Sequence, residues 1–347
     1  MKDHEIVERL ECWDEAETIY REIYRAQHGQ STMADVLRRW PEDNYFVQIS
    51  LDPAEYPHKV SEDYLLKADR SVAISKHPRY CRMPLHTHDY FELNYVLSGS
   101  CVQHFEDTSA ALTSGDICLL SPDAGHFIEA NADNVIVLNL AIRRSSFLNQ
   151  FPTLPRRDSA ISSFFMGNLY SRRKLRYLLA HTEGDDEIRH QALQMYGEEL
   201  NREAFSDDVM TSRMALMLNL LLRKYADCME APPLRQTQNP VTYDMLGYIH
   251  DHYTDVTLQQ VADAFHFSRQ YCSRLISDLT GCSFSELVTG FRVRHGEALL
   301  TGTFLSVEEI STRLGYADPE TFIRAFRKVR GLTPGQLRRQ ASTSARR

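Results

Sequence analysis

The chain has 347 residues, of which 43% are hydrophobic and 25% are charged. These values are ordinary for globular protein and exclude a disordered chain, a collagen-like chain and a small disulfide scaffold. The length suits about two domains. The acidic, amphipathic start is unlike a signal peptide, and the longest nearly apolar run, residues 214–222, is too short to span a membrane. Seven cysteines form no CxxC pair, so we expect free thiols and a cytoplasmic location.

The net charge of −8 is distributed unevenly along the chain. Residues 269–347 hold 13 Lys or Arg against 7 Asp or Glu, whereas residues 1–268 hold 26 against 40. A basic C-terminal end on an acidic body predicts a local anionic partner, and DNA is the obvious candidate.

Periodicity divides the first 230 residues into three zones. Residues 1–70 show a patchy helical stripe followed by prolines, and we expect a helical extension to which the sequence assigns no role. Residues 71–147 contain short alternating apolar runs between turn residues, which predicts an all-β domain with barrel-like spacing. Residues 148–230 return to helical periodicity and are expected to bridge the domains. A dimerisation helix pair is one interpretation of this bridge, but the apolar stretch near residues 214–222 favours buried core.

A linker and a wholly helical region follow. Residues 231–240 contain three prolines and no periodicity, which predicts the linker. Residues 241–340 hold well-marked helix starts, including Asp318 before Pro319 and Ser268 as further caps. The capping-box patterns are Thr257 with Gln260, Ser283 with Glu286, Ser306 with Glu309, and Thr333 with Gln336.

A pair of short helices joined by a tight turn occurs twice in this region. The first pair turns at His266 and its second helix begins after Ser268; the second pair turns at Gly315 and its second helix begins after Asp318. A helix, a tight turn and a second helix form a helix-turn-helix motif. Two copies on one chain can enter successive major grooves, about 34 Å apart, without a dimer.

Residues in and around these motifs carry a family resemblance. They are Ala262, Ser268, Arg274, Gly281, Arg292, Leu299, Leu300, Ile310, Gly315, Tyr316, Phe322, Phe326, Gly331 and Pro334. On these residues the region resembles the AraC/XylS family of transcription regulators. Three positions depart from the family pattern: His266 stands where the turn often has Gly, and Gly296 and Ser311 stand in place of packed Ala. These departures bear on helix packing and leave the expected DNA face unchanged.

The resemblance implies which residues contact DNA. Base-edge contacts would fall on Gln270, Ser273, Arg274, Glu320, Thr321 and Arg324. Their chemistry is suitable, because Arg pairs with guanine, Gln with adenine, and Glu accepts from cytosine. Phosphate contacts would fall on Ser268, Arg327, Lys328 and Arg338. The alternative interpretation is a helical bundle with a solvated charged face.

The β-rich zone contains the spacing HxHxxxE. His86, His88 and Glu92 share one parity, so on a strand they would point to one face. Gly115 and Asp116, followed by His126, form a second cluster. The two clusters resemble the cupin motifs found in the sensor domains of many AraC-type regulators. The second is degraded, since His126 directly follows a glycine, and Tyr80 stands where metal cupins usually have Gly.

The cupin resemblance leaves two interpretations of His86, His88, Glu92 and His126. In metal cupins their counterparts are ligands, and three histidines with a carboxylate suit Fe, Mn, Ni or Zn. In many sensor cupins such residues pack the strands or hydrogen-bond a small organic effector in the barrel mouth without metal. We favour the effector pocket and keep a divalent metal as the alternative.

The sequence carries no GxGxxG, Walker, HExxH or GxSxG motif, so no catalytic residue is assigned and we do not expect an enzyme. The expected fold is multidomain α+β: a cupin-like β-barrel with flanking helices, then an all-α double helix-turn-helix domain. The expected function is an effector-controlled transcription activator that binds double-stranded promoter DNA. RNA polymerase and a second copy of the chain are further expected partners. A metal-dependent enzyme or a metal or redox sensor fused to the DNA-binding module is the alternative.

Overall fold

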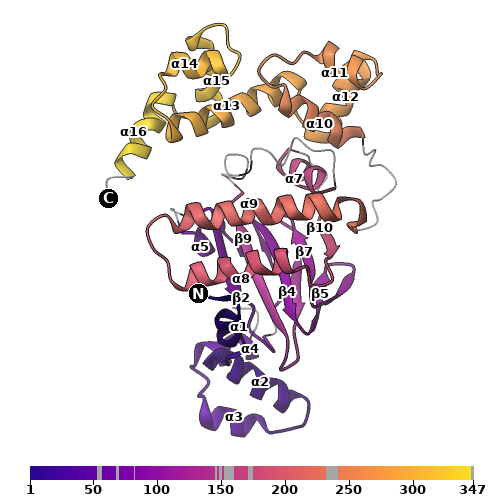
Figure 1. The fold of residues 1–347 in the computed structure, drawn as a ribbon, viewed down its shortest axis with the longest axis vertical. Helices are drawn as coiled ribbons and strands as arrows, with labels where there is room; N and C mark the ends of the chain where they lie inside the picture. The colour runs from indigo at the N-terminus through magenta and orange to yellow at the C-terminus, as the bar shows by residue number, and fades with distance from the viewer. Residues whose placement is uncertain are drawn as a thin grey trace. The chain divides into compact units, whose positions relative to one another are not determined.

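The computed structural model describes residues 1–52, 57–67, 70–81, 83–144, 147, 151, 160–170, 175–231 and 241–344. The chain divides into two compact units, one of residues 1–151 with 175–233, the other of residues 152–174 with 234–347 (Figure 1). Most of the linker expected at 231–240 lies outside the described residues. None of the described helices is long and apolar enough to cross a membrane.

The first unit begins with the expected helices. They are α1 (Asp3–Glu11), α2 (Glu15–Gln27), α3 (Met33–Arg39), α4 (Tyr45–Leu51) and α5 (Glu62–Leu65). Asp14 caps α2 by accepting from the Glu17 N–H, and Asn44 caps α4. Between α4 and α5, the short strand β1 (Lys59–Val60) pairs in parallel with β3 (Thr87–His88). The N-terminal segment is therefore hydrogen-bonded to the strand that carries His88.

Two antiparallel sheets form the centre of this unit. The five-stranded sheet has the order β10 (Tyr177–His181), β7 (Asp116–Leu120), β4 (Phe91–Ser98), β9 (Ile136–Ile142), β2 (Val72–Lys76). The three-stranded sheet has the order β6 (Ser109–Thr113), β5 (Ser100–Phe105), β8 (His126–Glu129). Apolar side chains of both sheets share one core, which includes Val96, Leu120 and Val137 with Phe105, Leu112 and Ile128.

The barrel-like spacing of the sequence suggested a closed barrel. The described strands instead form separate sheets and do not close into one hydrogen-bonded barrel. The β4–β9 register shifts between Val96 and Ser98, and Gly99 adopts φ +71°. A Cβ at Gly99 would lie 2.8 Å from the Val135 Cα, so glycine is needed where the chain leaves one sheet for the other. The architecture is cupin-like, with two sheets packed on each other and an isolated bridge between His86 and His126.

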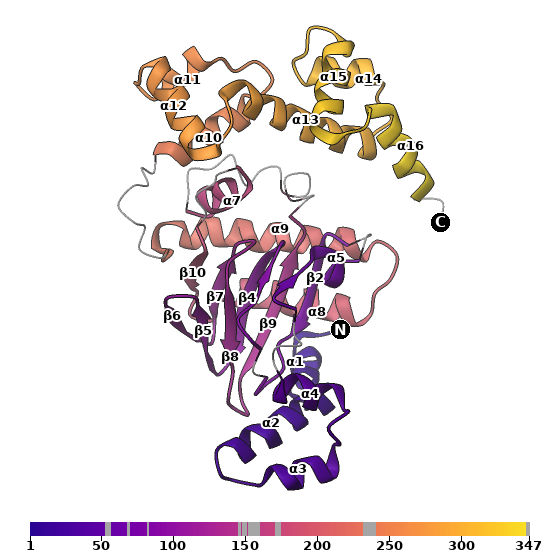
Figure 2. The ribbon, with the colours of Figure 1, turned by 180° about the vertical axis from the view of Figure 1, so that it is seen from behind.

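Two long helices cover one face of the five-stranded sheet (Figures 1 and 2). They are α8 (Asp186–Leu200) and α9 (Ser206–Tyr225). In α9 the side chains of Met214, Met217 and Leu218 are fully buried, as the core interpretation of this stretch requires. The helix α7 (Ala160–Tyr170) instead contacts α10 (Val241–Asp251) of the second unit. The expected bridging region is thus shared between the two units.

The second unit is helical throughout. After α10 come α11 (Leu258–Ala264), α12 (Arg269–Thr280), α13 (Phe284–Gly302), α14 (Val307–Arg313), α15 (Pro319–Arg330) and α16 (Pro334–Ser344). All four predicted capping boxes form their reciprocal hydrogen bonds, and Ser268 and Asp318 cap α12 and α15. The helix α13 joins the two helix-turn-helix pairs (Figure 2).

A buried ionic cluster fastens α2 to the β-domain. The Glu17 carboxylate is fully buried and accepts from the Arg79 guanidinium at 2.8 Å and the Lys76 ammonium at 2.7 Å. Arg79 also donates to the carbonyls of Cys12 and Asp133 and lies 4.0 Å from the Trp13 ring centroid. Burial alone would raise the pKa of Glu17, but these partners hold that pKa below its ordinary value.

Replacing Glu17 by Gln is expected to destabilise the first unit by about 3 kcal/mol, because two cations would lose their buried counter-charge. Urea unfolding followed by circular dichroism measures this loss. The control is Glu22→Gln on the same helix, whose partner Arg25 lies 3.5 Å away in a half-exposed pair. We expect a change below about 0.5 kcal/mol for the control, and equal effects of the two substitutions would contradict the structural role of Glu17.

Candidate functional site

The second helix of each helix-turn-helix pair presents one polar face. In α12 the side chains of Cys272 and Ile276 are buried, and in α15 those of Phe322 and Phe326 are buried. Of the residues expected to contact bases, Gln270, Arg274, Glu320 and Arg324 are exposed, whereas Ser273 and Thr321 are half-buried. The opposite sides of both helices are thus available to a partner.

Thr321 and Ser268 have capping roles as well. The Thr321 hydroxyl donates to the Asp318 carboxylate at 2.7 Å and accepts from Arg324 at 3.1 Å. The Ser268 hydroxyl accepts from the Tyr271 N–H. Both residues fix the start of the second helix of their pair, α12 or α15. We call these two the reading helices, because the base contacts are expected on them. Thr321 also orients the guanidinium of Arg324.

The expected phosphate-contacting cations differ in their surroundings. Arg327 and Lys328 are exposed in the last turns of α15. Arg338 is half-buried, and its guanidinium donates to the carbonyls of Leu300 at 3.2 Å and Leu305 at 2.6 Å. These bonds fasten α16 to the end of α13. The sequence analysis missed this structural role, because it depends on contacts 33 and 38 residues away in the chain.

Arg292 on α13 joins the two helix-turn-helix pairs. It donates to the carbonyls of Tyr253 at 2.8 Å and Thr254 at 2.9 Å, and it lies over the Tyr316 ring. Gly315, in the turn of the second pair, packs against the same Thr254 carbonyl. The loop before the first pair is therefore fixed to the turn of the second, which sets the mutual orientation of the reading helices.

The three departures from the family pattern are accommodated in the helical unit. His266 is exposed and adopts φ +56°, a conformation that glycine adopts at lower cost. A Cβ at Gly296 would lie 2.9 Å from Leu314 and 3.0 Å from Phe322, so these larger side chains fill the space. The buried Ser311 hydroxyl donates to the Asp318 carbonyl.

Gly315→Ala is expected to disrupt the second pair. Gly315 has φ +79°, and its added Cβ would lie 1.7 Å from the Thr254 oxygen. The control Gly331→Ala has a similar φ of +74° but meets nothing within 4 Å, so it should cost only the backbone strain of about 1–2 kcal/mol. Thermal unfolding of the two variants measures the difference; equal stabilities would show that the contact with Thr254 is unimportant.

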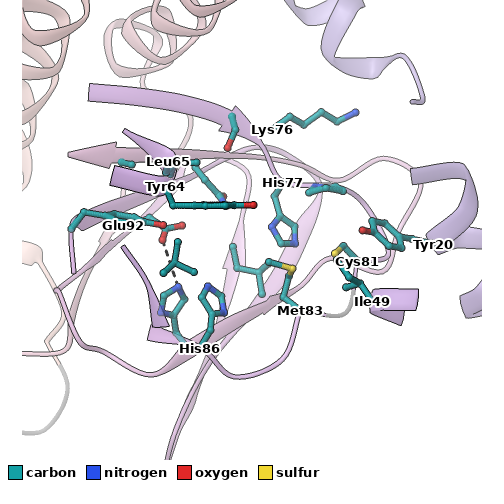
Figure 3. A pocket seen from close by; sticks show the side chains of 18 of the residues that line it. Tyr20, Ile49, Tyr64, Leu65, Lys76, His77, Cys81, Met83, His86 and Glu92 are labelled. Atoms are coloured by element: carbon teal, nitrogen blue, oxygen red, sulfur yellow. Dashed lines mark ion pairs between the residues drawn. The ribbon is translucent and has the colours of Figure 1, made fainter. Parts of the chain in front are cut away.

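The first unit contains a partly open pocket of about 280 Å³ between its sheets and the N-terminal helices. His86, Glu92 and His126 line it, and the fully buried His88 lies beside them. Figure 3 shows Glu92 and His86 below Tyr64, with His77 across the pocket from Glu92. The structure therefore brings the four residues of the cupin-like motifs to one place.

The carboxylate of Glu92 lies between two histidines. The His88 Nε2 is 2.8 Å from the Glu92 Oε2, and the His126 Nε2 is 3.6 Å from the same oxygen. Burial opposes ionisation of Glu92, but hydrogen bonds from His126 and His88 outweigh it and hold the Glu92 pKa well below its ordinary value. Glu92 is thus a buried anion.

Backbone carbonyls determine which histidine nitrogen faces the pocket. The Nδ1 of His88 lies 2.8 Å from the Tyr90 carbonyl, and the Nδ1 of His126 lies 3.0 Å from the Ala124 carbonyl. A carbonyl only accepts, so both Nδ1 atoms donate and both Nε2 atoms face Glu92. A neutral Nε2 and a carboxylate oxygen are both acceptors. The short His88–Glu92 contact therefore requires a proton or a cation between them.

The three atoms also meet the geometric requirement of a metal site. The donor atoms of His88, Glu92 and His126 lie within 4.8 Å of one another. Hydrogen bonding of Nδ1 to a carbonyl is the usual way in which a metal-binding histidine is oriented. His86 is outside this group of three, although its ring centroid is 4.7 Å from that of His126.

His77 is a pocket residue that the sequence analysis missed. It follows β2, lines the pocket and is buried, and burial lowers its pKa to about 4. Burial, with repulsion from His126, likewise lowers the pKa of His86 to about 4. Both imidazoles are therefore neutral at pH 7. No spacing linked His77 to the motif residues, because it reaches the pocket from a different strand.

Two family models match the chain. An AraC-like ligand binding domain matches residues 70–165, and a Helix-turn-helix domain matches residues 261–340. The HTH-type transcriptional activator RhaS of Escherichia coli (strain K12 / DH10B) is 26% identical over 280 residues, covering 80% of this chain and 95% of RhaS. The matched relatives are named as transcription regulators, which removes support for the enzyme alternative.

Two further matches each cover less than a third of this chain. The HTH-type transcriptional regulator YtdP of Bacillus subtilis (strain 168) is 34% identical over 91 residues, which are 26% of this chain and 12% of YtdP. Among solved structures, the C-terminal domain of AraT, a response regulator from Geobacillus stearothermophilus, is 36% identical. That match covers 30% of this chain and 88% of the AraT domain, with a TM-score of 0.29.

Proposed function

The chain belongs to the AraC family of DNA-binding transcription regulators, and we propose that it activates transcription under the control of a small-molecule effector. The observation that supports this proposal is a pocket with buried polar side chains in one unit and two exposed second helices of helix-turn-helix pairs in the other. Effector binding in the pocket would change the affinity for promoter DNA or expose a surface for RNA polymerase. The protein would act in the bacterial cytoplasm, as a homodimer at paired sites.

The reading helices supply the base contacts in this proposal. Gln270, Arg274, Glu320 and Arg324 are exposed on one side of α12 or α15, with Ser273 and Thr321 beside them. Arg274 extends along the Tyr271 ring, with 5.6 Å between guanidinium and ring centroid, which stiffens it for a directed contact. Arg327 and Lys328 would neutralise phosphates.

Arg274→Ala is expected to weaken binding to the preferred DNA site by about 1–3 kcal/mol and to relax the preference at one base pair. In contrast, Arg327→Ala should weaken binding to all DNA sequences alike. It should also reduce the slope of log affinity against log salt concentration by about one, the contribution of a single phosphate contact. Selection of binding sites from random DNA, followed by titration at several salt concentrations, measures both. An unchanged base profile for Arg274→Ala would contradict its assignment.

The effector-control proposal is tested with the selected DNA site placed upstream of a reporter gene. Expression that rises with a small molecule and depends on His77 or Glu92 would support an effector-controlled activator. Expression that never exceeds the level without the protein would contradict activation.

Metal sensing is a second candidate function. Its support is the convergence of the His88 and His126 Nε2 atoms on Glu92, which leaves a place for a positive charge. His88, Glu92 and His126 would hold a divalent transition metal, with His86 nearby. Such an ion supplies a Lewis-acidic position for an effector oxygen or nitrogen. The protein's own contribution is the carbonyl bonds that orient both imidazoles.

Elemental mass spectrometry on untagged protein purified without chelators tests the metal. Near-stoichiometric metal that is lost in a His86→Ala/His88→Ala variant is expected if the site binds metal. The control is His104→Ala, which removes a half-buried histidine that pairs with Glu129 outside the pocket lining. Absence of metal, together with no change in the visible spectrum on adding Co²⁺, would leave an organic-effector pocket.

A further inference from the structure

The N-terminal helices form one wall of the pocket. Tyr20 of α2, Tyr45 and Ile49 of α4, and Tyr64 and Leu65 of α5 all line it. Every one of these residues precedes residue 70, where the match to the AraC-like ligand binding domain begins. Figure 3 shows Tyr64 lying across the pocket, with Tyr20 and Ile49 beside Cys81 at one side.

This wall is fixed in place from both ends. The buried Glu17–Lys76–Arg79 cluster fastens α2 to the segment that carries His77. On the other side, the Thr87 N–H donates to the His58 carbonyl and the Asp89 N–H donates to the Val60 carbonyl. These bonds flank His88. The N-terminal segment therefore positions histidines on two sides of the pocket as well as closing it.

The charges of the pocket restrict the ligand. Lys76 is the single Lys or Arg among the described lining residues, and Glu17 holds its ammonium at 2.7 Å. Glu92 contributes a buried carboxylate. His88 and His126 already contact Glu92, and Glu17 already holds Lys76, so a carboxylate or phosphate on the ligand would be desolvated with no further cation to pair with, which is costly.

Buried polar atoms that lack a hydrogen-bond partner among the described residues further restrict the chemistry of the ligand. The Asn139 Oδ1 and the His77 Nε2 are buried and have no hydrogen-bond partner among the described residues. Both residues line the pocket. The Asn139 oxygen can only accept, so a ligand that satisfies it must donate. Four tyrosine side chains and Ile49 provide surfaces for an apolar or aromatic face.

We propose that α2, α4 and α5 are part of the effector-binding site, and that this site takes a compact amine- or hydroxyl-bearing ligand with no negative charge. This inference rests on the proposed effector pocket and names its ligand class. It also assigns a role to the N-terminal extension: the helices set the length of the pocket, with Ile49 at one side.

Three probes of nearly equal size test the ligand class. Benzylamine, benzyl alcohol and benzoate are titrated into the EDTA-treated full chain, and binding is followed by saturation-transfer NMR. EDTA treatment ensures that a bound metal cannot attract the carboxylate. Benzylamine and benzyl alcohol should bind at least about tenfold more tightly than benzoate, because only benzoate brings a buried charge next to Glu92. Equal or tighter binding of benzoate, or binding of none of the three, would overturn the ligand class.

Two substitutions test the N-terminal wall. Ile49→Ala should admit 1-naphthylmethylamine at least about tenfold more tightly than the unchanged chain does, because it removes volume from the wall. Ile49→Trp should weaken benzylamine binding, whereas the exposed Leu51→Trp on the same helix should leave it unchanged. If the folded Ile49→Ala variant binds the probes with the same affinities as the unchanged chain, the N-terminal helices are not a wall of the ligand site.

Failure of the proposed ligand site can be distinguished from failure of the proposed regulatory function. Operator binding and reporter activation are measured on the same variants without probes. If the probes fail while an effector-dependent reporter response remains, the regulator proposal stands and only the ligand class or the wall is wrong. If probes bind as expected but no small molecule alters transcription, the pocket is correct and its regulatory role is wrong.

Discussion

A charge that leaves water must meet an opposite charge or several dipoles, and this constraint determines both units of the protein. In the first unit Glu17 is fully buried and gathers Lys76, Arg79 and several carbonyls around it. In the second, Arg292 and Arg338 satisfy their guanidinium groups on carbonyls at loop and helix ends. These contacts join segments far apart in the sequence, so they define how the helices and sheets are assembled.

The Arg292 contact has a direct consequence for DNA reading. Two helix-turn-helix pairs that moved independently would lose orientational freedom on binding, and that loss would reduce affinity. Arg292, the Thr254 carbonyl and Gly315 fix the pairs to each other through α13. Two prearranged helices can then contact successive grooves with less ordering cost. The two pairs therefore form one body within this unit rather than two linked modules.

The sequence predicted the helical unit well, because its signals are local. Capping boxes span three residues, and the pairs Ser268–Tyr271 and Asp318–Thr321 form as the cap positions indicate. The sequence predicted an all-β domain but did not predict that its strands form separate sheets. The change from one sheet to the other depends on the register shift near Ser98 and on the contact of Gly99 with Val135. Such long-range contacts leave no periodic pattern.

The pocket was predicted only in part, for the same reason. HxHxxxE placed His86, His88 and Glu92 together through strand parity, and the second motif added His126. Tyr20, Ile49 and His77 reach the same cavity from separate elements, and no spacing relates them to Glu92. Arg338, which was expected to contact phosphate, has two carbonyl partners that only tertiary packing supplies.

The electrostatics of Glu92 link the pocket's occupants to one another. The carboxylate is buried, and the two imidazoles that face it present Nε2 because their Nδ1 atoms are bound to carbonyls. The space between these groups suits a metal ion or a donor group of a ligand, because the Glu92 carboxylate can only accept. Each of these occupants would displace the other. The β1–β3 pairing ties this site to the N-terminal wall, because Val60 and His88 are register partners.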